Sequence, residues 1–123
     1  MKPQRYFIPS DLVLRVDIND LYDADDNPIT INDVTLIQLT FTSGGASEVF
    51  EINPSTPSEN TAGVSIVTPA DGKGDPYIIV CLCTKNLKPG QLTLRSDITI
   101  PDARFHDNER HESDEMLFPI TLA

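Results

Sequence analysis

Seven short runs of alternating apolar and polar residues extend along this chain from Leu12 to Ala123, separated by segments rich in Pro, Gly, Asn and Asp. Because successive side chains of a strand point to opposite faces, each run predicts a strand with one buried face. The clearest run places its apolar side chains at Leu12, Leu14, Val16 and Ile18. No long stretch shows the helical period, so the pattern constrains the chain to an all-β fold.

The spacing of the runs indicates how the strands are arranged. About seven strands at intervals of roughly 8 to 15 residues, joined by turns, are typical of an antiparallel immunoglobulin-like β-sandwich. The antibody-type disulfide is not expected, because Cys81 and Cys83 are too close in sequence and the chain has no Trp to pack on it. A length of 123 residues predicts a single sandwich domain over residues 11–123, preceded by an extended N-terminal arm over residues 1–10.

Three segments between and within the runs carry further expectations. Gly44-Gly45 predicts a tight hairpin that leads into a strand containing Phe50 and Ile52. Residues 77–83 are apolar at almost every position, which predicts a central strand buried on both faces, either within the subunit or between subunits. Residues 102–115 are mostly charged or polar, and we expect a long loop there, anchored by Phe105, before the last strand.

The charge balance excludes some classes of partner. Nineteen acidic against nine basic residues give a formal net charge of −10, which repels nucleic acid and anionic membranes. The N-terminal residues lack the apolar segment of a signal peptide, and no run approaches the roughly 18 apolar residues of a membrane span. We therefore expect neither nucleic-acid nor membrane binding, and we interpret the charge as a source of solubility.

Two sets of residues have some of the features of a metal site. Cys81 and Cys83, with His106 and His111, form a Cys-x-Cys and His-x4-His set, but the cysteine spacing is tighter than in a usual zinc site. We interpret both cysteines as small, reduced core residues. Asp23, Asp25 and Asn27 match the first three ligand positions of a calcium loop.

The rest of that calcium pattern is missing. Pro28 occupies the position of the turn glycine, and Val34 occupies that of the bidentate Glu. An ordinary acidic turn is the favoured interpretation, while a looser cation site that includes Asp17 or Asp20 stays open. The sequence thus predicts no cofactor.

No arrangement of residues predicts catalysis. The chain has no Gly-x-Ser-x-Gly motif and no phosphate-binding glycine loop. Neighbouring carboxylates such as Glu112 and Asp114 occur in a charged run rather than an apolar pocket that would separate their pKa values. We therefore predict a protein that is not an enzyme and acts through its surface.

Two segments resemble parts of known virion proteins. Residues 12–18, followed by 23–29, resemble the opening hairpin of immunoglobulin-like domains in structural proteins of tailed phages. Residues 87–92, then 100–102 with Phe105, resemble the later half of small virion-associated domains from phages of gut Bacteroidetes, including crAss-like phages. The resemblance implies a capsid-decorating, head-fibre or tail-associated protein, located in the virion and assembled in the host cytoplasm.

The sequence therefore predicts docking on other virion structural proteins, with homo-oligomers also possible. The residues expected to bind a partner are Arg5, Tyr6, Phe7, Ile8 and Phe105. The arm residues among them lie between two prolines and would add to the sheet edge or groove of a neighbour. An equally weighted alternative is that the arm covers its own sandwich. The rival function is a carbohydrate- or protein-binding module at a bacterial surface, with residues 53–60 and 102–115 as its recognition loops.

Overall fold

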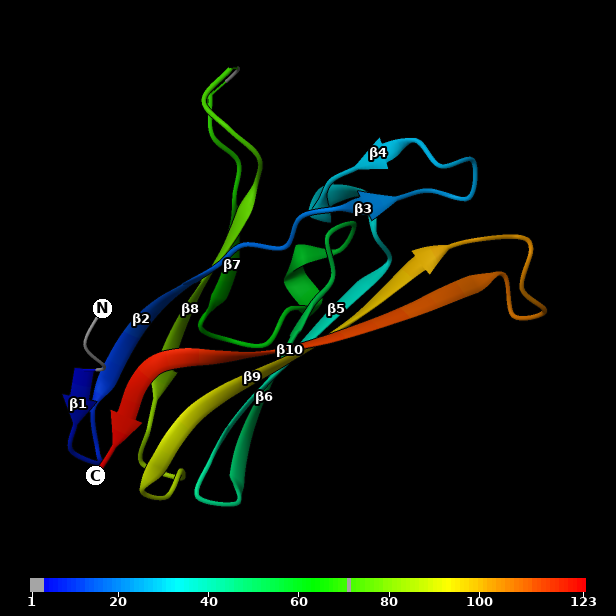
Figure 1. Cartoon of the computed structure of the whole chain (residues 1–123). Coiled ribbons are helices and arrows are strands. Elements are labelled where there is room, and N and C mark those ends of the chain that lie inside the picture. Colours follow the sequence, from blue (N-terminus) through cyan, green and yellow to red (C-terminus); the bar gives the residue numbers. More distant parts are fainter. Residues whose placement is uncertain (1–3, 71) are drawn as a thin grey trace.

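The computed structural model describes residues 4–70 and 72–123, and these form a protein built mostly of β-strands (Figure 1). The larger sheet has five strands in the order β1-β10-β9-β5-β6. All of its neighbouring strands are antiparallel except β1 and β10, which are parallel. Its strands are β1 (Gln4–Tyr6), β5 (Leu36–Ser43), β6 (Ala46–Ile52), β9 (Gly90–Pro101) and β10 (Glu109–Leu122).

A second, three-stranded antiparallel sheet has the order β2-β8-β7. Its strands are β2 (Asp11–Val16), β7 (Val64–Val67) and β8 (Tyr77–Cys83). The remaining elements are the two-stranded pair β3 (Leu21–Tyr22) and β4 (Pro28–Ile29), with the short 3₁₀ turns η1 (Ile31–Asp33) and η2 (Pro57–Glu59). The prediction of an all-β fold is confirmed.

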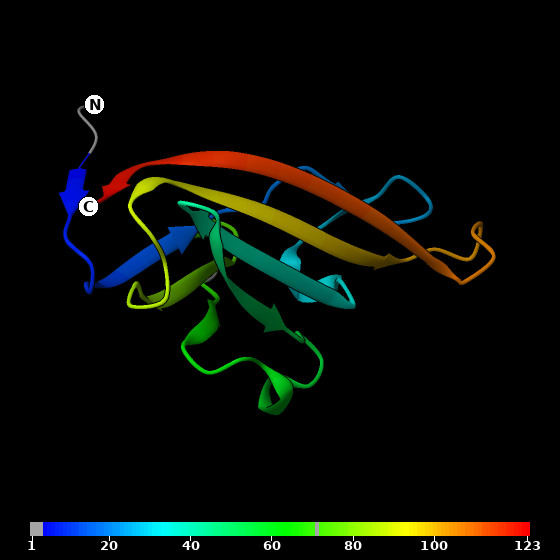
Figure 2. The same cartoon turned by 90° about the horizontal axis from the view of Figure 1, so that it is seen from below.

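One apolar core joins the two sheets, because each sheet turns its alternate aliphatic side chains toward the other. Figure 2 shows β10, β9 and β5 as one layer, with β2 and β8 in the layer below. Phe41 is fully buried and its ring meets Phe50 edge to face, with ring centroids 5.9 Å apart. Of the apolar residues predicted to share one face of the first clear strand, Leu12, Leu14 and Val16 are buried and Ile18 is half-buried. The alternate residues Ile37 and Leu39 of β5 and Leu92, Leu94, Ile98 and Ile100 of β9 are also buried.

The tight hairpin predicted at Gly44-Gly45 joins β5 to β6. Both glycines have positive φ, 60° and 83°, as a two-residue turn between twisted strands requires. A side chain at Gly44 would also collide with neighbouring backbone, because its Cβ would lie 2.6 Å from the carbonyl oxygen of Pro89. The prediction of a hairpin here, with Phe50 and Ile52 in its second strand, is confirmed.

The prediction for residues 102–115 is wrong. Residues 102–115 do not form one long loop, because β10 already begins at Glu109 and pairs with β9 back to Pro101. Only residues 102–108 connect the two strands, so β9 and β10 make a long ribbon whose tip extends past β5 (Figure 1). The exposed residues of β10 take the strand conformation because β9 supplies their hydrogen-bonding partners, although no apolar alternation marks them.

For strand β8, the sequence left open whether the second face is buried within the subunit or between subunits. The strand is central in its sheet, as predicted, with β2 on one side and β7 on the other. Its inward residues Ile78, Val80 and Leu82 are buried, but Cys81 and Cys83 on the opposite face are exposed. Among the residues that the structure describes, only one layer packs against the three-stranded sheet, so the second face is not buried within the subunit, and burial between subunits stays a prediction.

Candidate functional site

The N-terminal arm adds a strand to the protein's own larger sheet. Residues Gln4, Arg5 and Tyr6 lie in register with Ile120, Thr121 and Leu122 of β10. The backbone continues this pairing, because the amide of Ile8 donates to the carbonyl oxygen of Ala123 and the amide of Ala123 donates to Tyr6, each at 2.9 Å. In the isolated subunit, the arm thus covers an edge of its own sandwich, the second of the two alternatives left open by the sequence.

The apolar residues of the arm separate into two groups. Tyr6 and Ile8 pack against the core, whereas Phe7 is 70% exposed. The guanidinium carbon of Arg5 lies 5.6 Å from the centre of the Phe7 ring, within the range of a cation–π contact. Of the predicted partner-binding residues of the arm, Arg5 and Phe7 are exposed, and Tyr6 and Ile8 are half-buried.

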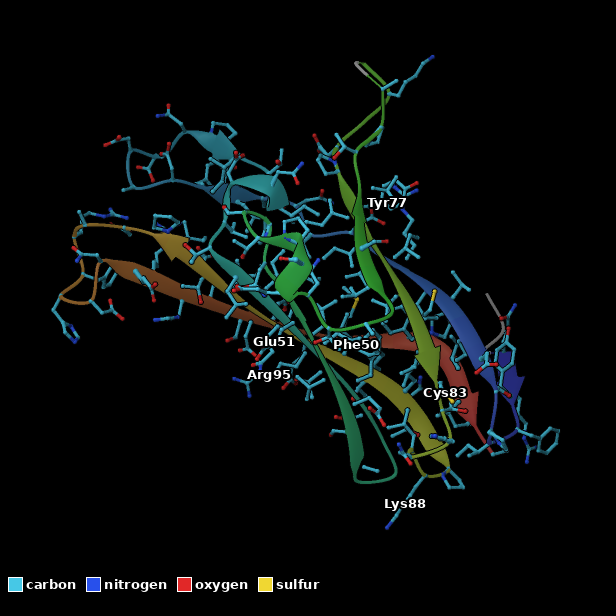
Figure 3. All side chains as sticks on the ribbon, turned by 180° about the vertical axis from the view of Figure 1, so that it is seen from behind. Phe50, Glu51, Tyr77, Cys83, Lys88 and Arg95 are labelled. Carbon is cyan, nitrogen blue, oxygen red and sulfur yellow. The ribbon has the colours of Figure 1, made fainter. Side chains whose placement is uncertain are left out.

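A second exposed apolar area lies on the outer face of the three-stranded sheet. Val13 of β2 is 72% exposed and lies directly opposite Cys81 of β8. Cys83 is exposed beside Asp11, and Ile79 is half-buried on the same face. Tyr77 lies toward the other end of β8 (Figure 3), where the guanidinium of Arg15 stacks 3.8 Å from its ring centre. We call these five residues, Val13, Tyr77, Ile79, Cys81 and Cys83, the β8 face.

The cysteines of the β8 face were misjudged from the sequence as buried core residues. Both are free thiols on the exposed side of β8. Their spacing of two along a strand places them on one face, as predicted. No sequence signal marks this exposure, because the pairing of Cys81 with the exposed Val13 is visible only in the sheet register.

The tip of the β9–β10 ribbon is organised around a buried carboxylate that sequence analysis did not single out. The side chain of Asp102 is fully enclosed and lies 2.7 Å from Nη2 of Arg104 and 2.7 Å from Nη1 of Arg110. These hydrogen bonds, those of Arg104 above all, hold the pKa of Asp102 far below its ordinary range. Arg110 also donates to the carbonyl oxygen of Tyr22, which ties the ribbon to the β3–β4 pair.

Phe105 does not anchor this connection. Its side chain is 45% exposed, and the turn is closed instead by hydrogen bonds from Phe105 N to Asp102 O and from Asn108 N to Phe105 O. Asp102 performs the anchoring expected of the aromatic ring, because a buried charge with two arginine partners fixes the chain around it. Phe105 remains an exposed aromatic residue at the ribbon tip.

The acidic segment after β3 is folded as a turn. The Oδ1 atom of Asp23 accepts the backbone N–H groups of Asp25 and Asn27, both at 2.9 Å. The bond from Asn27 is the main reason that the pKa of Asp23 is lowered. The segment therefore forms the acidic turn that the sequence favoured.

Among residues 4–70 and 72–123, a group of at least three close His, Cys, Asp or Glu ligand atoms occurs in one place, at Asp107, Glu109 and His111. The group includes none of the acidic-turn residues, neither cysteine, and not His106. The metal sets considered from sequence are therefore not brought together.

The outer face of the five-stranded sheet carries a shallow polar depression of about 530 Å³ across β5, β9 and β10. Its floor includes Arg95 and Asp97, which form an ion pair at 3.1 Å. Ser113 donates to Asp97 at 2.5 Å, and this bond is the main cause of the lowered pKa of Asp97. The lining residues include no Phe, Tyr or Trp ring on which a sugar could stack.

Comparison with known proteins adds no relative. No protein-family model matches the chain, and no curated protein matches it. In the part of the chain that the structure describes, no helix is long and apolar enough to span a membrane. The fold defines the protein as an all-β domain with two packed sheets.

Proposed function

We propose that this protein is a non-enzymatic structural protein that docks onto another protein subunit through the β8 face and the neighbouring arm. The observation that carries the proposal is the exposed apolar β8 face, with Val13 72% exposed and both thiols open to solvent. Burial of such a surface is the main favourable term in protein association. Because β1 leads directly into β2, the exposed Arg5 and Phe7 lie next to this face in the chain.

We further propose that the fold is immunoglobulin-like. The order β2-β8-β7 corresponds to strands B, E and D of that fold, and β10-β9-β5-β6 corresponds to strands G, F, C and C′. This strand order supports the proposal more strongly than the strand count, because unrelated sandwiches share numbers of strands but not their order. On this assignment, β1 is an additional edge strand beside strand G.

The setting we propose is the virion of a tailed phage, with capsid, fibre or tail subunits, or further copies of this chain, as partners. The resemblance of residues 12–29 and 87–105 to phage structural proteins motivates this setting. An uncovered sheet face on a small acidic domain is compatible with it, since stable assembly of protein subunits buries surface on each partner. The net charge of −10 favours a docking site that is apolar or basic.

The experiment compares two matched substitutions on the purified protein and on assembled particles. Val13→Asp places a charge on the β8 face, and Val49→Asp places the same charge on the outer face of the five-stranded sheet, where Val49 is 45% exposed. We expect Val13→Asp to abolish co-sedimentation with particles and Val49→Asp to retain it. Equal retention by both variants, with folding confirmed by circular dichroism, would overturn the docking proposal.

The arm is tested separately. Deletion of residues 1–9 removes β1 and the exposed Phe7, whereas Phe7→Ala removes only the exposed ring. We expect both changes to weaken docking if the arm contributes to it. Docking that survives Phe7→Ala but not the deletion would assign the arm a purely structural role at the sheet edge.

The second candidate function is a carbohydrate- or protein-binding module at a bacterial surface. The polar depression across β5, β9 and β10 favours it, because Gln38, Thr40 and Asp97 offer hydrogen-bonding groups side by side. A glycan array is the direct test. Binding that is lost in Thr40→Ala and unaffected by Val13→Asp would select this function over the first.

A further inference from the structure

The end of the β9–β10 ribbon gathers three potential metal ligands. Asp107, Glu109 and His111 each offer one ligand atom, and these atoms all lie within 4.8 Å of one another. Nε2 of His111 lies 3.3 Å from Oδ2 of Asp107 and 3.9 Å from Oε2 of Glu109. Two ligands of one tetrahedral zinc ion are separated by about 3.4 Å when each bond is about 2.1 Å long. The separation of 3.3 Å between Nε2 of His111 and Oδ2 of Asp107 is close to that value, and the separation of 3.9 Å from Oε2 of Glu109 is somewhat longer.

The spacing of the three residues explains why they converge. Glu109 and His111 are two apart on β10, so both side chains point to the outer face of the sheet. Asp107 belongs to the preceding turn, and its Oδ1 accepts the backbone N–H of Glu109 at 3.1 Å. This bond leaves Oδ2 of Asp107 directed at the imidazole ring.

A residue outside the group fixes the orientation of the ring. Thr99 of β9 lies opposite His111 in the sheet register, and its hydroxyl is 3.3 Å from Nδ1. Histidines that bind metals almost always have their second nitrogen hydrogen-bonded in this way, which holds the ligating nitrogen toward the ion. Here that nitrogen is Nε2, and it faces the two carboxylates.

The close approach of two carboxylate oxygens and an imidazole nitrogen favours a bound cation. The lone pair of a neutral Nε2 and the two carboxylate oxygens would repel one another at these distances. A bound metal ion relieves the repulsion. The side chains are 40% to 61% exposed, so an ion can enter from solvent.

We propose that Asp107, Glu109 and His111 form a binding site for a divalent transition-metal ion of the zinc class. One imidazole nitrogen and two carboxylate oxygens suit Zn²⁺, while the hard ions Mg²⁺ and Ca²⁺ prefer oxygen ligands alone. Three protein ligands leave at least one coordination position open to water or to a group from a partner. The site lies on the outer face of the five-stranded sheet, away from the β8 face on the other sheet.

The test is a titration of the whole chain with Zn²⁺, followed by calorimetry and by the imidazole resonances in NMR. The background carries Cys81→Ser and Cys83→Ser, because the exposed thiols would otherwise bind zinc themselves. We expect one ion to bind per chain and the resonances of His111 to shift. His111→Asn and the double variant Asp107→Asn with Glu109→Gln should each weaken binding at least 10-fold.

The matched control is His106→Asn, which removes the histidine of the turn that precedes β10 and should leave zinc affinity unchanged. Thr99→Val removes the hydroxyl from Nδ1 and should weaken binding about 10-fold, because second-shell partners of metal-bound histidines have effects of that size. Mg²⁺ and Ca²⁺ should not shift the His111 resonances.

Three results would overturn the proposal. One is zinc affinity that is equal in the parent and in His111→Asn. Another is an equal loss in His106→Asn, which would indicate weak binding by any exposed histidine. The third is a parent that binds no zinc at millimolar concentration, which would assign the group to contacts among its own side chains alone.

Discussion

The two sheets bury their inner faces in the same core but differ in what they expose. The outer face of the five-stranded sheet carries polar groups that bind one another, such as the Arg95–Asp97 ion pair and the Thr42–Ser47 hydrogen bond, beside the exposed Val49 and Leu117. The outer face of the three-stranded sheet exposes Val13 and two thiols, next to an ion pair of Arg15 with Asp17. The two faces thus differ in how many of their exposed groups are paired with one another, and the proposed docking site is on the second face.

The contrast also explains why alternation alone left two interpretations of β8 open. In β5, polar residues such as Gln38 and Thr40 alternate with buried Ile37 and Leu39, so one exposed face is evident. In β8, the outward residues are themselves apolar, which usually indicates burial on both sides. A face that is apolar and uncovered in the subunit is the surface on which the proposed partner would dock.

The largest expected effect compares neighbouring residues on the two faces of β8. Ile78→Ala should lower the free energy of unfolding by about 2–5 kcal/mol, because Ile78 is fully buried and leaves a cavity. Ile79→Ala should cost about 1 kcal/mol or less, because the outer face has no covering layer. Urea denaturation measures both. Equal costs would break the contrast between the faces, because they would mean that the outer face is packed.

A second prediction concerns acid, which should affect the ribbon of the larger sheet first. The pKa of Asp102 is lowered from its ordinary 3.8, mainly by its hydrogen bond from Arg104. A carboxyl with a lowered pKa stabilises the fold fully above its unfolded pKa, and that contribution is lost as pH falls below about 4 toward the folded pKa. Unfolding measured from pH 6 to 2 should show this loss, and Asp102→Asn should flatten it.

The amide-exchange pattern serves as the control for the acid prediction. Protection of β9 and β10 near the ribbon tip should decline with acid before that of β2 and β8 does, because Asp102 and its arginine partners belong to the ribbon. A simultaneous decline in all four strands would show instead that the Asp102 cluster stabilises the whole domain as one unit.

The third prediction uses the cysteines as reporters of the β8 face. In the native free protein, Cys81 and Cys83 should both react with a water-soluble disulfide reagent within about tenfold of their rate in denaturant, because both are exposed. Docking should slow this reaction strongly. Native thiols that are already protected at low protein concentration would contradict the exposed face, and protection that rises with concentration would indicate self-association.

The smallest expected effect is on the polar outer face. Removal of the exposed pair by Arg95→Ala should lower the free energy of unfolding by about 0.2–1 kcal/mol, and less at high salt, because exposed ion pairs are weak and screened. Thermal unfolding at two salt concentrations provides the measurement. A larger, salt-independent loss would mean that this face is structurally more important than its exposure suggests.

Much of the fold was predictable because alternation reports local geometry. The inward residues of β2, β5 and β9, the Gly44-Gly45 hairpin and the all-β class all follow from side-chain period and turn chemistry. The acidic turn at Asp23 followed for the same reason, since its hydrogen bonds run to residues two and four positions away. Interactions this local are encoded by neighbours in the sequence.

The candidate sites were less predictable. The arm was recognised as extended, yet nothing in residues 4–8 indicates that β10, more than a hundred residues away in sequence, is its partner. Nor does the charged stretch from Glu109 onward predict a strand, because its conformation is imposed by pairing with β9. In the sequence, Asp102 is one more acidic residue of a loop, and only the structure shows that Arg104 and Arg110 pair with it.

The sequence by itself determined which side chains share a face of each strand, because the period of two is a property of the extended backbone. Only the tertiary structure decided which of those faces another layer covers, since coverage depends on how distant strands pair and stack. For this reason the apolar residues of β8 were foreseeable as a strand, while their exposure was not. The contact of Thr99 with the ring of His111 likewise depends on the register of β9 and β10.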